Sequence, residues 1–124
     1  MNAATGVKLS TREFKAATGM TARQVDYWTR CGVFGARNIS VGSGNGREWP
    51  ESLVVAGRAC CDITNLFAEV GITGGSVEVL RDLVAFIVEH DVAPPARLYL
   101  TGTSVTFDRP AGSHLVLELR DGAR

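Results

Sequence analysis

The sequence lacks the features that mark several classes of protein. Its 124 residues contain three cysteines (Cys31, Cys60 and Cys61) and no CxxC pair, so neither a disulfide framework nor a thiolate metal site is expected. The longest purely apolar run, residues 83–88, is far too short to span a bilayer. The opening residues, MNAATGVK, have no apolar core of the kind found in signal peptides. These absences predict a globular cytoplasmic protein with free thiols and no membrane contact.

There is also no excess of charge of either sign, which by itself argues against a nucleic-acid-binding protein. The charges are unevenly distributed, however. Residues 1–58 hold eight Lys/Arg and four Asp/Glu, a balance of +4, whereas residues 59–124 hold five and nine, a balance of −4. A basic half joined to an acidic half suits a protein that places one end on phosphates. Chance segregation of the charges is the alternative explanation.

Two short helices, each with a capping box, are predicted near the start of the chain. Ser10 and Glu13 begin the first helix, which is expected to end near Gly19. Thr21 and Gln24 begin the second helix only a few residues later. Two capped short helices separated by a glycine turn are typical of a helix-turn-helix unit.

The second helix carries the candidate DNA-contact residues. Arg23, Tyr27 and Arg30 recur at i, i+4 and i+7 on one stripe, with Gln24 and Trp28 beside it. Arginine and glutamine near a helix N-terminus are residue types that contact base edges, and guanidinium and hydroxyl groups can contact phosphates. A merely solvated stripe is the alternative, and for Trp28 packing in the core is favoured. The predicted DNA-binding residues of the two helices are Arg12, Arg23, Gln24, Tyr27 and Arg30.

The residues that follow predict a two-stranded ribbon, or wing. Gly32 is expected to end the second helix, and strand-like residues at 38–41 and 47–49 flank a glycine-rich tip. Arg37 and Arg47 would pair with phosphates, and Trp49 would support the core. The glycine cluster lacks the Lys-Ser/Thr of a P-loop, so a nucleotide site is not favoured.

Two longer apolar helices are predicted next. Pro50 is expected in the first turn of a third helix whose apolar stripe runs from Leu53 to Val70 and includes Cys60. A fourth helix opening at Ser76 is apolar on more than one side, so it needs two neighbours, and a second copy of the chain is a candidate for one of them. The residues predicted at this dimer contact are Val79, Leu83 and Phe86.

The C-terminal part predicts a small sheet, with strands at 97–101 and 104–108 around a turn at Gly102-Thr103 and a third strand at 115–119. It could cap the core, contribute to a dimer contact or form a ligand pocket. His90 and His114 lack neighbouring ligand patterns and are expected at the surface. No nucleophile–base pair, carboxylate pair or ligand cluster occurs at a usable spacing, so we expect no enzyme activity, no metal and no cofactor.

The stretch GMTARQVDYWTRCGV, residues 19–33, together with GREW, residues 46–49, resembles the MerR family of transcriptional regulators. The resemblance covers roughly residues 9–72 and is fairly specific, because its separate pieces occur in the right order. It implies a winged helix-turn-helix, DNA binding and a dimer, but no effector. Asp26 stands where the family usually has arginine, so that phosphate contact is not carried over. The segment RQVDYWTR looks like that of a branch of this family that includes the regulator FtsR.

The sequence therefore predicts a mainly α fold with small β elements (α+β), in three parts. Residues 1–8 form a flexible N-terminal tail, 9–72 a winged helix-turn-helix domain, and 73–124 a helix plus a β-rich dimerisation or accessory region. The function expected is sequence-specific regulation of transcription by a homodimer on double-stranded DNA, with RNA polymerase or another regulatory protein as an optional partner. The alternatives are a DNA-bending, excisionase-like recombination directionality factor and a protein-interaction module on the same scaffold.

Overall fold

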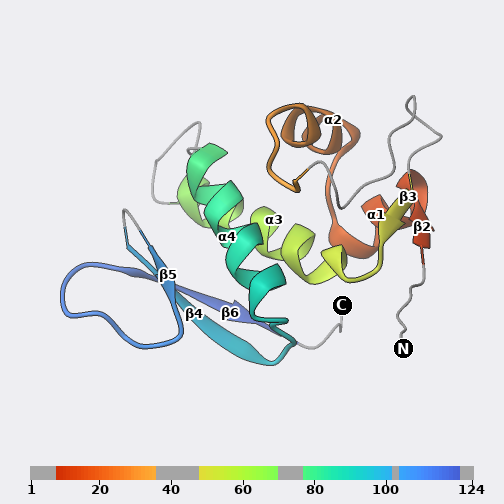
Figure 1. Cartoon of the computed structure of the whole chain (residues 1–124). Helices are drawn as coiled ribbons and strands as arrows, with labels where there is room; N and C mark the ends of the chain where they lie inside the picture. The colour runs from red at the N-terminus through yellow and green to blue at the C-terminus, as the bar shows by residue number, and fades with distance from the viewer. Residues whose placement is uncertain (1–7, 36–47, 70–76, 102–103, 121–124) are drawn as a thin grey trace.

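The computed structural model describes residues 8–35, 48–69, 77–101 and 104–120. Within these ranges the chain forms four helices and two small antiparallel sheets, an α+β fold (Figure 1). None of the helices in these ranges has both the length and the apolar character needed to cross a bilayer. The elements in chain order are β2 (Lys8–Ser10), α1 (Thr11–Thr18), α2 (Ala22–Arg30), β3 (Glu48–Pro50), α3 (Leu53–Glu69), α4 (Val77–Glu89), β4 (Ala96–Leu100), β5 (Val105–Thr106) and β6 (Leu115–Leu119).

Both predicted capping boxes are present at the starts of α1 and α2. The backbone N–H of Glu13 donates to Ser10 Oγ at 3.1 Å, and the N–H of Ser10 donates to Glu13 Oε1 at 2.8 Å. Thr21 and Gln24 exchange the same two hydrogen bonds, each at 3.0 Å. Gly19 follows α1 with a left-handed φ of 84°, so the predicted stop is also confirmed. Local side-chain chemistry thus sets where both helices begin.

The N-terminal sheet differs from the expected ribbon. β3 pairs antiparallel with β2, so that Leu9 lies opposite Trp49 and Lys8 opposite Pro50. Lys8, assigned to the tail, therefore belongs to a strand. The expectation that Pro50 lies in the first turn of a helix is wrong, because it ends β3, and a strand end is a position where proline's missing N–H is tolerated. The rest of the predicted wing, residues 36–47, lies outside the described residues.

An aromatic cluster forms the core of the N-terminal half. The rings of Phe14 and Trp49 are stacked, with centroids 4.3 Å apart, and Phe34 contacts both rings edge-on at 6.0 and 5.7 Å. All three side chains are buried, and the indole N–H of Trp49 donates to Thr11 Oγ1 at 3.0 Å. The cluster joins α1, the segment after α2 and β3, because each contributes one ring. Trp49 thus has the core-support role predicted for it.

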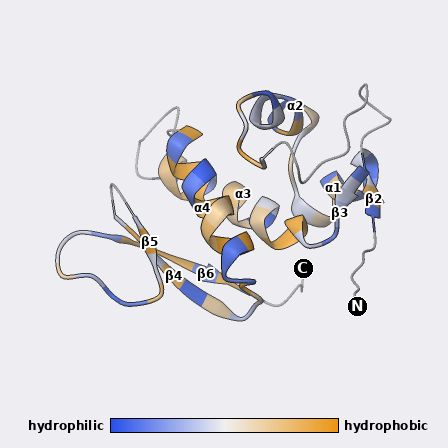
Figure 2. Cartoon of the chain, in the orientation of Figure 1, coloured by the Kyte–Doolittle hydropathy of each residue, from blue (hydrophilic) through white to orange (hydrophobic). Residues whose placement is uncertain are grey.

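Helix α3 lies at the centre of the fold, between α1 and β3 on one side and the C-terminal sheet on the other (Figure 1). Its predicted stripe is confirmed for Leu53, Ala56, Cys60 and Ile63, which are fully buried, and Phe67 is half-buried. Figure 2 shows α3 as largely hydrophobic and α2 as largely hydrophilic. The predicted helix end at Val70–Gly71 lies outside the described residues.

Helix α4 packs beside α3, and this contact corrects one predicted dimer residue. Leu83 is fully buried in the chain's own core, together with Leu80, Val84 and Ile87. The prediction that Leu83 contacts a second copy is therefore wrong. The apolar width of α4 is explained by the neighbours that the same chain supplies. Val79 and Phe86 are half-buried.

The C-terminal sheet has the strand order β5–β4–β6, with both pairs antiparallel. The third predicted strand is confirmed at Leu115–Leu119, whereas β4 is shifted by one residue and β5 is shorter than expected. Leu98 lies opposite Leu117, and both are buried with Leu100 and Leu119. One face of the sheet thus packs on the core. Of the three roles considered for this sheet, the capping role is therefore the one that this packing supports. The turn at Gly102-Thr103 lies outside the described residues.

Candidate nucleic-acid interface

Helix α2 is attached to the protein through one face. Val25 and Trp28, one turn apart, are 3% and 5% exposed and belong to the main core cluster. Trp28 therefore has the supporting role that was favoured for it. Ala22, predicted to lie on the same buried side, is exposed instead. These two large side chains anchor the helix, and Gln24 and Thr29 are half-buried.

The opposite face presents the predicted stripe. Arg23, Tyr27 and Arg30 are all exposed, and the Arg30 guanidinium carbon lies 6.0 Å from the centroid of the Tyr27 ring. A hydrogen bond with the Cys31 thiol is the largest cause that raises the pKa of the Tyr27 phenol above its ordinary value. The phenol therefore stays neutral and can act as a hydrogen-bond donor at physiological pH. The structure brings these three predicted residues together on one surface.

Asp26 pairs with Arg30 on the same face. Asp26 Oδ2 lies 3.0 Å from Arg30 Nη2 and accepts a hydrogen bond from Arg30 Nε at 3.2 Å. Both side chains are more than half exposed, at 59% and 65%, so the pair contributes little to stability. A phosphate oxygen could replace the carboxylate at small cost. Asp26 thus neutralises one of the two guanidinium groups on the stripe.

Two other predicted DNA-binding residues, Gln24 and Arg12, are not part of the exposed stripe. The Oε1 atom of Gln24 accepts the N–H of Thr21, so this side chain caps α2. A bidentate contact to adenine uses the same oxygen, and giving up the cap would cost about 1 kcal/mol. Arg12 is exposed on α1, in the first turn of a different helix. Arg37 and Arg47 lie outside the described residues.

Two arginines that the sequence interpretation did not single out hold the ends of α1 and α2. Arg58 of α3 donates through Nε to the carbonyl oxygen of Ala17 at 2.8 Å. Arg81 of α4 donates through Nη2 to the carbonyl oxygen of Cys31 at 3.0 Å. Cations at helix C-terminal carbonyls are favoured by the helix dipole. Gly32, with φ 77°, follows Cys31 and confirms the predicted stop. Helices α3 and α4 thereby help to orient the helices that carry the candidate interface.

The cysteines offer little reactive chemistry. Burial raises the pKa of the Cys60 thiol well above its ordinary range and that of Cys61 to about 11. The thiolate is the nucleophile and the metal ligand, so both groups are poorly reactive at neutral pH. In the part of the chain that the structure describes, no three His, Cys, Asp or Glu side chains gather in a way that could hold a metal ion.

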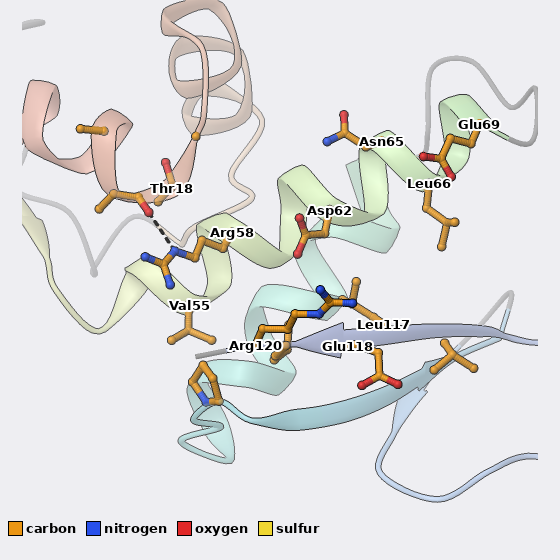
Figure 3. A pocket seen from close by; sticks show the side chains of 16 residues that line it. Thr18, Val55, Arg58, Asp62, Asn65, Leu66, Glu69, Leu117, Glu118 and Arg120 are labelled. Carbon is orange, nitrogen blue, oxygen red and sulfur yellow. Dashed lines mark hydrogen bonds between the residues drawn. The ribbon is translucent and has the colours of Figure 1, made fainter. Parts of the chain in front are cut away.

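A second candidate feature is a cleft of about 650 Å³ between α3, the C-terminal end of α1 and β6 (Figure 3). Arg58, Asp62 and Arg120 all line this cleft. Burial is the largest influence on Asp62 and raises its pKa above the ordinary value, although the nearby Arg120 and Arg58 oppose the shift. A ligand pocket was one of the three roles considered for the C-terminal sheet, but the residues of this cleft were not predicted, because its walls come from four segments far apart in the chain: the end of α1, α3, Pro94 and β6.

Comparison with protein-family models, with curated proteins and with solved structures finds no match for this chain.

Proposed function

We propose that this protein is a sequence-specific DNA-binding regulator of transcription, in which α1 and α2 form the helix-turn-helix of a MerR-like winged head. The observation that supports this most strongly is the division of α2 into two faces. Val25 and Trp28 anchor one face, and the other exposes Arg23, Tyr27 and Arg30. A helix held in this way can enter a groove of DNA without uncovering its own core.

In this proposal Arg23 has the base-reading role. It lies in the first turn of α2, and recognition helices contact base edges through their N-terminal residues. Tyr27 and Arg30 lie further along the same face and would contact the phosphate backbone. Arg37 and Arg47 are proposed as further phosphate contacts from the wing.

We propose a homodimer that places two α2 helices in successive major grooves. Since Leu83 is internal, the contact would centre on an aromatic patch that combines Phe86, His90 and Phe107. The Phe86 ring lies 4.2 Å from the His90 ring and 4.8 Å from the Phe107 ring, measured between centroids. Phe107 is 48% exposed. RNA polymerase or another regulatory protein would be the further partner.

Replacing Arg23 tests the recognition role. The wild-type chain is first used to select fragments from a genomic DNA pool in the presence of competitor DNA. Arg23→Ala is then expected to lose about 1–3 kcal/mol of discrimination between the selected site and unrelated DNA, because a bidentate contact to a base is lost. Arg109→Ala, at an exposed position of the C-terminal half, is the matched control and should bind as wild type. Failure to select any competitor-resistant fragment would contradict the proposal.

Replacing Asp26 should strengthen DNA binding. Asp26→Asn removes a negative charge from the stripe and releases Arg30 for a phosphate. The slope of log K against log salt is expected to steepen by about 0.9, the value for one further neutralised phosphate. Fluorescence titrations at several salt concentrations measure this slope, with Asp108→Asn as the control. The gain should vanish in the Arg30→Ala background, and a gain that persists there would show that Arg30 is not the group released.

The Asp26–Arg30 ion pair also supports a second candidate, a protein-interaction module, because it halves the free positive charge of the stripe. Lack of DNA retention even at low salt would favour this candidate. A DNA-bending directionality factor is the third candidate. Circular-permutation gel shifts on an attachment site would distinguish bending from simple site recognition.

A further inference from the structure

Strand β6 is an edge strand. In the order β5–β4–β6, its strand partner within the described residues is β4 alone. In an edge strand, alternate residues direct their backbone N–H and C=O groups outward, where they can pair with another chain. Such edges are usually blunted or covered. What lies along the outer edge of β6 therefore decides whether another chain can pair with it.

The cleft described above runs along this edge. It is lined by the consecutive residues 116–120. Successive side chains of a strand point to opposite faces of the sheet, so a cleft against one face would touch only alternate residues. A lining of five consecutive residues places the cleft beside the edge itself. The facing wall is α3, and Figure 3 shows Val55, Asp62 and Leu66 on it opposite Leu117 and Arg120.

We propose that this cleft binds an extended segment of a partner protein, which pairs with β6 as a fourth strand of the C-terminal sheet. Strand addition in a groove between a sheet edge and a helix provides main-chain hydrogen bonds for affinity and side-chain contacts for specificity. The cleft volume of about 650 Å³ lies within the range of ligand pockets. Five residues of β strand span about 17 Å, so a short segment suffices.

The charges of the cleft indicate the chemistry of the segment. Arg58 and Arg120 lie at the end next to α1, Glu69 lies at the opposite end, and Asp62 lies between them (Figure 3). Glu118 of β6 also lines the cleft, but its charge is balanced by an ion pair with Arg97 at 2.8 Å. Arg58 uses its Nε atom to bind the carbonyl of Ala17, and its two terminal nitrogens are not part of that bond. A complementary segment has an acidic residue at the arginine end and a basic residue at the Glu69 end.

The direction of the segment follows from strand pairing. Figure 3 shows that β6 runs towards Arg58, so its C-terminal end lies at the basic end of the cleft. Antiparallel pairing is the more stable arrangement, and it places the N-terminus of the segment beside Arg58 and Arg120. The segment therefore reads acidic, apolar, polar, apolar, polar, basic. Val55 and Leu66 of α3 provide apolar contacts for its middle residues.

Peptide binding to the full chain tests this inference without DNA, so its failure is separable from failure of the proposed function. The probe is a fluorescent, acetylated and amidated hexapeptide of that order, and the comparison peptide has its two charged residues exchanged. The first is expected to bind about tenfold more tightly. Arg120→Glu should remove this preference, whereas Arg109→Glu, outside the cleft, should leave it unchanged.

Backbone methylation distinguishes strand addition from other binding. Peptides N-methylated at the second and fourth residues, or at the third and fifth, block opposite edges of the added strand. One pair of modifications should abolish binding and the other should leave it intact. Equal effects of both would overturn the proposal. So would binding of free amino acids in place of the peptide, or a dimer in sedimentation that Arg120→Glu dissociates, because these outcomes indicate a small ligand or a second copy as the occupant.

Discussion

Trp49→Ala is expected to lower the free energy of unfolding by about 3–5 kcal/mol, the usual cost of truncating a buried aromatic side chain. The indole is fully buried, stacks on Phe14 and meets Phe34 edge-on. Its loss would leave a cavity where α1, β3 and the segment after α2 meet. Because a single small domain has only about 5–15 kcal/mol of stability, this loss would be a substantial part of the total. Urea denaturation followed by far-ultraviolet circular dichroism measures the change.

Trp49→Phe is the matched control for this prediction. It retains an aromatic ring for stacking but removes the N–H that donates to Thr11 Oγ1. We expect it to cost clearly less than the alanine variant. Thr11→Val removes the acceptor of the same hydrogen bond and should cost about 1 kcal/mol. Equal losses for Trp49→Ala and Trp49→Phe would show that the ring cluster does not stabilise the fold as described.

Gly57→Ala is expected to destabilise the protein by about 1–3 kcal/mol, in the range for inserting a methyl group into a packed contact. A Cβ atom built at Gly57 would lie 2.7 Å from Thr18 Cγ2 and 3.3 Å from Phe14 Cζ. Alanine favours a helix by about 1 kcal/mol over glycine, so the net loss would underestimate the steric effect. The glycine is needed because α1 crosses α3 at this point. Thermal and urea unfolding measure the loss.

A double-mutant cycle with Thr18→Ser tests the cause of that loss. Serine lacks the Cγ2 methyl group but keeps the hydroxyl that donates to the carbonyl of Phe14 at 2.8 Å. In the Thr18→Ser background, Gly57→Ala should become close to neutral, because the clashing atom is gone. Residues in contact commonly show such coupling, with energies of about 0.5–3 kcal/mol. Strictly additive effects would mean that the Thr18 methyl group is not the obstacle.

The arginines at the helix ends connect the two surfaces of the protein. Arg58 lines the cleft and also binds the last turn of α1, while Arg81 of α4 binds the end of α2. A segment bound in the cleft would contact Arg58 directly. The cleft therefore shares the Arg58 side chain with the last turn of α1, the helix that precedes α2.

The sequence by itself determined the features that depend on neighbours along the chain. The two capping boxes, the glycine stops at Gly19 and Gly32, the buried stripe of α3 and the strand β6 were all predicted, because their signals lie within a few residues. The exposed stripe of Arg23, Tyr27 and Arg30 followed from helical periodicity alone. In each case the backbone geometry of one element sets which side chains share a face.

Only the tertiary structure decided the features that depend on distant residues. The pairing of β2 with β3 placed Pro50 in a strand, and the packing of α4 on its own chain buried Leu83. Arg58 and Arg81 reach carbonyl groups 41 and 50 residues away, and β6 meets α3 to form the cleft. The residues around a single arginine on a helix do not predict which distant carbonyl group it will bind. Such contacts depend on how whole elements pack, which the order of residues along one element does not show.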